Sequence, residues 1–91
     1  MHMDNDSMSK EDRREVILQF MADTGLALPP APLYYNMKEE MFVTFSKRTM
    51  QRLLKEMRGE GLVCKIEQGD GYWKVTDEGR EYLQNADDGR T

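Results

Sequence analysis

The chain has 91 residues, which is enough for one small domain and excludes a two-domain enzyme. Its single cysteine and single histidine exclude an intramolecular disulfide and a tetrahedral zinc site, and we expect no metal and no cofactor. No apolar run approaches the roughly 20 residues of a membrane span and no signal peptide is visible, so we expect a cytoplasmic protein without membrane contact.

The net charge of −4 hides an uneven distribution of charge along the chain. Between Lys47 and Lys74, seven basic residues stand against four acidic ones, whereas the rest of the chain has six basic and thirteen acidic residues. Local polarity matters more for binding than total charge, because a partner meets one face of a protein. The basic segment is therefore the candidate for contact with an anionic partner.

The polar ends of the chain have little apolar surface to bury. We expect a disordered leader over residues 1–8, a folded domain over 9–84 and a disordered tail over 85–91.

A capping-box pattern starts at Ser9, and apolar residues follow it at helical spacing. This predicts a first helix over 10–24, closed by Gly25 in a left-handed conformation. All three prolines lie between Leu26 and Pro32, which predicts a turn there.

A short second helix is expected to begin at Pro32, because apolar residues then recur along one helical stripe as far as Met41. Phe42 to Phe45 would connect it to a third helix that Ser46 caps and that runs to Arg58. One face of this third helix has an apolar stripe, formed by Met50, Leu53, Leu54 and Met57.

Short β-prone runs on both sides of Gln68-Gly69-Asp70-Gly71 predict a β-hairpin over 62–76. Within it, Trp73 should point into the core with Val75, and Tyr72 should lie on the opposite face. Thr76 or Asp77 can cap a short last helix. Three helices, a hairpin and a short C-terminal helix are the elements of a winged helix-turn-helix domain of the α+β class.

In that architecture the third helix lies in the major groove of duplex DNA. At 100° per residue, five cations and one amide lie away from its apolar stripe. We interpret Arg48, Gln51 and Arg52 as candidates for base contacts, because arginine can bind guanine and glutamine can bind adenine through two hydrogen bonds. Lys47 and Lys55 are the candidates for phosphate contacts. The competing interpretation is a merely solvated helix face, which normally mixes both signs of charge.

The hairpin is the second candidate contact. Lys65 and Lys74, with the backbone of Gly69 and Gly71, could follow the phosphates or the minor groove as a wing. An ordinary tight turn is the alternative, and Glu67 and Asp70 would repel phosphates unless they face away.

Several motifs in this order are similar to those of the phage phiH repressor-like regulators of haloarchaea and their viruses. The resemblance covers roughly Asp12 to Leu83. The residues that carry it are Arg13-Arg14, Thr44-Phe45-Ser46 with Thr49, Gly61-Leu62-Val63, and the segment Gly71-Tyr72-Trp73-Lys74-Val75-Thr76-Asp77-Glu78-Gly79-Arg80-Glu81-Tyr82-Leu83 with its aromatic strand.

The resemblance implies a DNA-binding transcriptional repressor that acts as a homodimer on a palindromic operator. It assigns contacts from the third helix to Ser46, Lys47, Arg48, Thr49, Gln51 and Arg52. In such a dimer the first and last helices would form the seam, and the two recognition helices would lie about 34 Å apart.

A second function remains open from a different class: a winged helix that uses its basic face to dock an acidic protein. An enzyme is the weakest hypothesis, because the sequence offers no nucleophile with a neighbouring base.

Overall fold

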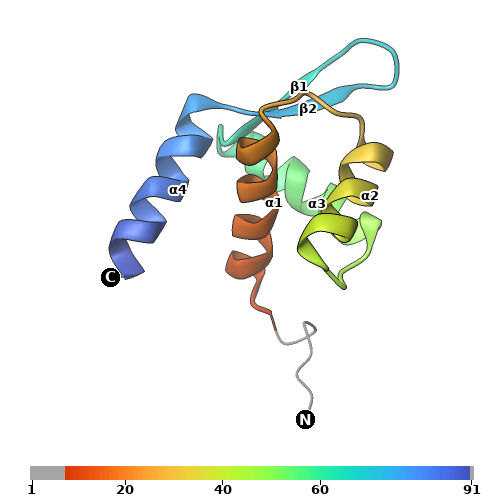
Figure 1. Ribbon diagram of the computed structural model, residues 1–91. Helices are drawn as coiled ribbons and strands as arrows, with labels where there is room; N and C mark the ends of the chain where they lie inside the picture. Colours follow the sequence, from red (N-terminus) through yellow and green to blue (C-terminus); the bar gives the residue numbers. More distant parts are fainter. Residues whose placement is uncertain (1–7, 91) are drawn as a thin grey trace.

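The computed structural model describes residues 8–90, and for residues 87–90 it describes the backbone alone. The elements follow one another as α1 (Lys10–Thr24), α2 (Pro30–Met41), α3 (Lys47–Gly59), β1 (Val63–Ile66), β2 (Tyr72–Val75) and α4 (Asp77–Arg90). Figure 1 shows α1 at the centre with α4 on one flank and α2 on the other, and the antiparallel hairpin crosses above them. The predicted α+β class and order of elements are confirmed.

The ends of the helices follow from local chemistry. The Ser9 side chain accepts a hydrogen bond from the Asp12 N–H at 3.0 Å, and Gly25 closes α1 with a φ of 66°. Helix α2 begins at Pro30, earlier than the predicted start at Pro32. Both prolines fit in the first turn, because the N–H groups that proline lacks have no partner inside a helix at these positions.

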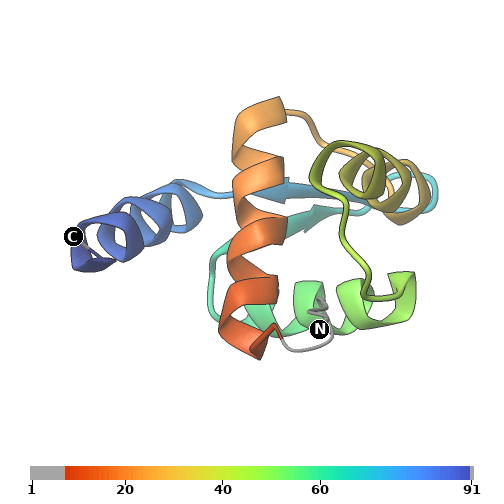
Figure 2. The ribbon, with the colours of Figure 1, turned by 60° about the horizontal axis from the view of Figure 1, so that its bottom comes forward.

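Helix α4 continues to Arg90, past residue 84, at which the folded domain is expected to end. Extending an existing helix costs much less than starting one, and the buried Leu83 anchors α4 on α1. Figure 2 shows α4 projecting away from the rest of the domain. Residue 91 lies outside the described residues, as do residues 1–7 of the expected leader. In the part of the chain that the structure describes, no helix combines the length and the apolar character needed to cross a membrane.

The core lies between the helices and the inner face of the hairpin. The apolar stripe of α3 is buried as predicted, with all four side chains at most 1% exposed, and it packs with Ile17 and Leu18 of α1. Trp73 is 4% exposed and Tyr72 is 38% exposed, which confirms the predicted faces of β2.

The segment between α1 and α2 adds a single-residue β-bridge that the sequence did not predict. Leu28 donates a backbone hydrogen bond to the Trp73 carbonyl at 3.0 Å and accepts one from the Trp73 N–H at 2.8 Å. In Figure 1 this segment runs beside β2. Strand β2 is therefore paired on both of its edges.

The junction between β2 and α4 is closed by Thr76 and Gly79. The Thr76 hydroxyl donates to the Gly61 carbonyl at 2.6 Å and accepts from the Gly79 N–H at 3.0 Å, so Thr76 provides the predicted cap. A Cβ on Gly79 would collide with the Leu62 carbonyl oxygen and would lie 2.8 Å from Cγ2 of Val75. The first turn of α4 can approach Leu62, the residue before β1, only because position 79 has no side chain.

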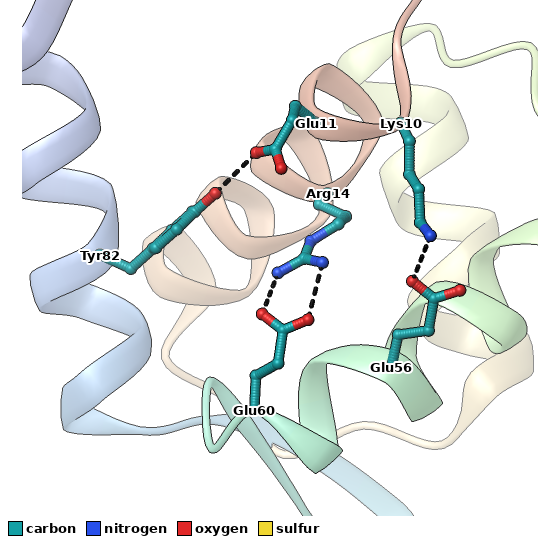
Figure 3. A network of polar contacts seen from close by, with 6 residues as sticks. All are labelled: Lys10, Glu11, Arg14, Glu56, Glu60 and Tyr82. Atoms are coloured by element: carbon teal, nitrogen blue, oxygen red, sulfur yellow. Dashed lines mark hydrogen bonds and ion pairs between the residues drawn. The ribbon is translucent and has the colours of Figure 1, made fainter.

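Helix α1 holds α3 near both of its ends. The buried Arg14 binds Glu60, the residue that follows α3, through both of its terminal nitrogens, with one contact at 2.9 Å. Near the other end of α3, the Arg13 guanidinium lies 5.9 Å from the centre of the Phe45 ring. Figure 3 shows the Arg14–Glu60 contact with a second ion pair of 2.9 Å between Lys10 and Glu56 of α3.

These contacts shift the pKa values of the groups involved. The hydrogen bonds from Arg14 lower the pKa of the Glu60 carboxyl, and the same contact raises the pKa of Arg14. Tyr82 of α4 donates a hydrogen bond of 2.8 Å to Glu11, which raises the pKa of its phenol (Figure 3). The network therefore joins α1 to both α3 and α4.

We expect Gly79→Ala to destabilise the domain by about 1–3 kcal/mol, because the added methyl group must displace the backbone of Leu62 before β1. Urea unfolding measures this change in free energy. Gly59→Ala in α3 is the matched control, since a Cβ there meets no atom within 4 Å. Alanine is the better helix former, so the control should be neutral or stabilising. Equal effects of the two substitutions would contradict the steric argument.

We expect Glu60→Gln to lower the free energy of unfolding at pH 7 by about 1 kcal/mol, since Glu60 is half exposed and solvent weakens the pair. The lowered pKa of Glu60 means that its contribution is present above its ordinary pKa of 4.5 and disappears as the pH falls through the folded value. The wild type should therefore lose more stability between pH 6 and pH 3 than Glu60→Gln does. Chemical unfolding measures the free energy of unfolding against pH for the wild type, Glu60→Gln and the control Glu39→Gln. The role of the pair would be refuted if these three curves ran in parallel.

Candidate nucleic-acid interface

The solvent side of α3 has the cations that the sequence pattern predicts there. Lys47, Arg48, Arg52 and Lys55 are all exposed, on the side of the helix away from its buried stripe. Gln51 lies among them and is half-buried. The helix thus presents long hydrogen-bond donors to solvent from a rigid, packed element.

These four cations have no acidic partner among the residues that the structure describes. Glu56, the acidic residue within α3, is turned toward α1 and pairs with Lys10. Arg58 lies 3.7 Å from Glu67 of the hairpin, so its charge is partly neutralised. The exposed face of α3 therefore has one sign of charge, unlike the mixed surface of an ordinary solvated helix.

Ser46 and Thr49 are first of all structural. The Ser46 oxygen accepts a hydrogen bond from the Thr49 N–H at 3.1 Å, and the two hydroxyl groups lie 3.2 Å apart. This confirms Ser46 as the N-cap of α3. This hydrogen bond fixes the first turn of α3, at one end of the basic face. Ser46 is exposed there, and Thr49 is half-buried.

The connector before α3 is held from α2. The Tyr34 hydroxyl donates a hydrogen bond of 2.8 Å to the Phe45 carbonyl, and the Phe45 side chain is buried. The start of α3 is thereby fixed relative to α2.

The structure separates the four residues predicted for the hairpin contact. Gly69 and Lys74 are exposed, and the Lys65 ammonium lies 5.6 Å from the centre of the Trp73 ring. Gly71 is buried, and the Lys65 side chain occupies the space that a Cβ at this position would need. Gly71 thus provides room for Lys65 and does not belong to the exposed set.

The described residues contain no group of three or more histidine, cysteine, aspartate or glutamate side chains that could hold a metal ion. The exposed cations offer hydrogen-bond donors and positive charge, which suit phosphate oxygens and base edges.

The contacts that position α3 were missed from the sequence, although one signal for them was present. Arg14 shares a helical face with Ile17, Leu18 and Met21, at spacings of three, four and seven residues. A charged residue on a buried stripe requires a buried or half-buried partner of opposite charge. The pattern did not identify Glu60 as that partner.

Neither a protein-family model nor a curated protein matches the sequence. Solved structures similar to the chain include those described as the complex structures of hsRosR-S4 (vng0258/RosR-S4) and hsRosR-S1 (VNG0258H/RosR-S1). The first has a TM-score of 0.73 at 15% identity, covering 94% of this chain and 73% of the other. The second has a TM-score of 0.72 at 16% identity, covering 97% and 77%. This likeness, together with the order of elements, shows that the chain has the winged helix-turn-helix fold.

Proposed function

We propose that the chain is a transcriptional regulator that binds duplex DNA without catalysis, with α3 in the major groove and the hairpin as a wing. The observation that carries this proposal is the basic face of α3, which is exposed, has no neutralising partner in the described structure and lies on a helix held near both ends. The fold supports it, because a helix in this position of a helix-turn-helix domain enters the major groove.

The side chains of α3 divide by their chemistry. Arg48 and Arg52 can each donate two hydrogen bonds to a guanine, and Gln51 can do so with an adenine. Lys47 and Lys55 suit phosphates, because the ammonium group of lysine is a point charge on a flexible chain and can bind a phosphate oxygen from many directions. With α3 in the major groove, Ser46 and Thr49 of its first turn would add contacts beside those of Lys47 and Arg48.

The wing adds positive charge at Lys65 and Lys74 and an exposed backbone at Gly69. Glu67 and Asp70 are also exposed near its tip, and Glu67 partly neutralises Arg58. We assign the wing a contact with the phosphate backbone through its lysines, which contributes less to specificity than α3 does.

The finer assignments are part of the same proposal. We infer that the protein acts in the cytoplasm as a homodimeric repressor of the phage phiH repressor-like type. The seam would lie along α1 and α4, and the projecting α4 in Figure 2 supports this choice because it leaves much of that helix uncovered.

We expect the protein to bind a labelled random-sequence duplex with an affinity that falls steeply with salt, by a log–log slope of about −0.9 per neutralised phosphate. Arg48→Ala/Arg52→Ala should weaken this binding by about tenfold or more, since each arginine supplies a charge-assisted contact. Fluorescence anisotropy over a salt series measures both quantities.

The control is Lys38→Ala, compared with the single variant Arg48→Ala, because it removes one positive charge from an exposed position outside α3, the wing and the proposed dimer seam. If both variants lost the same DNA affinity, the loss would come from the change in net charge, and a contact by α3 would be contradicted. No DNA binding at low salt would overturn the proposal and favour the alternative, a module that docks an acidic protein on the same face.

We expect sedimentation velocity to show a dimer at the concentrations at which DNA binds, because two recognition helices about 34 Å apart match one turn of the duplex. A monomer across that concentration range, with DNA binding intact, would contradict the homodimer and leave the assignment of α3 standing.

A further inference from the structure

A cleft of about 440 Å³ opens on the side of the domain between the C-terminal half of α1, the following linker and α2. Its volume falls within the roughly 300–1,000 Å³ typical of small-molecule sites. It is lined by Phe20, Asp23, Thr24, Leu26, Leu28, Asn36, Glu40 and Met41. None of these residues belongs to the basic face of α3 or to the hairpin.

The lining combines apolar surface with negative charge. Phe20, Leu28 and Met41 are buried or half-buried, and Leu26 is 58% exposed at the opening. Asp23 and Glu40 are the charged residues of the lining, and no basic side chain lines the cleft.

Both carboxylates are available to an occupant. Within the part of the chain that the structure describes, neither forms an ion pair. One oxygen of Asp23 accepts a hydrogen bond of 2.9 Å from Gln19, which fixes the orientation of the side chain. A cation in the cleft would therefore meet two carboxylates beside apolar walls.

We propose that this cleft binds an organic cation with an apolar body. The apolar walls favour a hydrophobic ligand, and the two carboxylates favour a positive charge on it and disfavour an anion. A compact inorganic cation would leave the apolar walls in contact with water. A ligand that combines both properties matches the lining best.

The position of the cleft connects its occupant to the rest of the domain. Leu28 lines the cleft and is hydrogen-bonded through its backbone to Trp73 of the wing. Helix α2 forms the opposite wall and is tied by Tyr34 to the residue before the α3 cap. A ligand in the cleft therefore touches the two segments that support the candidate DNA-binding elements.

Isothermal titration with tetraphenylphosphonium, in the absence of DNA, tests the proposal independently of the proposed function. Tetraphenylborate has nearly the same shape and the opposite charge, so it is the matched ligand. We expect the phosphonium ion to bind and Asp23→Asn/Glu40→Gln to weaken that binding by about tenfold, the effect of losing two partly exposed charge pairs. Asparagine at 23 keeps the oxygen that accepts from Gln19.

The control variant is Glu39→Gln/Glu81→Gln, which changes the net charge equally at exposed positions outside the cleft. Its affinity for the phosphonium ion should equal that of the wild type. Equal losses in both variants, or equal binding of tetraphenylborate, would overturn the proposal, and so would no binding of the phosphonium ion.

Methyl NMR of the wild type gives a second measurement that needs no variant. The phosphonium ion should shift the methyl signal of Met41, which lines the cleft, and leave that of the fully buried Met57 unchanged. A shift confined to other methionines would place the ligand elsewhere. Dissociation of a dimer on addition of the ion would show that a second copy of the chain occupies this surface instead.

Discussion

The bidentate contact between Arg14 and Glu60 is the constraint on which the arrangement of the helices depends. It joins the start of the domain to the residue after α3, across 46 positions of sequence, with the guanidinium buried. Because an unpaired buried charge is costly, this contact permits few other placements of α3 against α1. With Arg13 on Phe45, α1 contacts α3 near both of its ends, so α3 presents its outer face in a fixed orientation.

The second organising principle is the separation of charge between two faces. Glu56 and Glu60 pair with residues of α1, and Glu67 partly neutralises only Arg58 in the last turn of α3, so the other cations of α3 keep their charge. Asp23 and Glu40, on the side of the cleft, leave their negative charge exposed to that side. A protein with a negative total charge can thus present a positive surface to one partner and a negative surface to another.

The elements could be predicted from the sequence because each has a strong local signal. Ser46 determines where α3 begins, the apolar stripe determines which face of α3 is buried, and the glycines of the hairpin determine where its turn lies. The β-bridge at Leu28 could not be predicted, since one pair of backbone hydrogen bonds leaves no periodicity and the adjacent prolines indicate a turn. For the candidate site, exposure of the α3 cations follows from the helical pattern. The burial of Gly71 does not follow from any sequence pattern, because it depends on how the Lys65 side chain folds back over the turn.

The pairing of Leu28 with Trp73 has a consequence for how the hairpin meets a partner. An isolated two-stranded hairpin is at best marginally stable in water. Here its inner strand is paired on both edges, and Trp73 is anchored in the core. The backbone of β2 is therefore already ordered around Trp73 in the free protein. Any partner binds a preorganised surface, and little of the binding free energy is spent on ordering that segment.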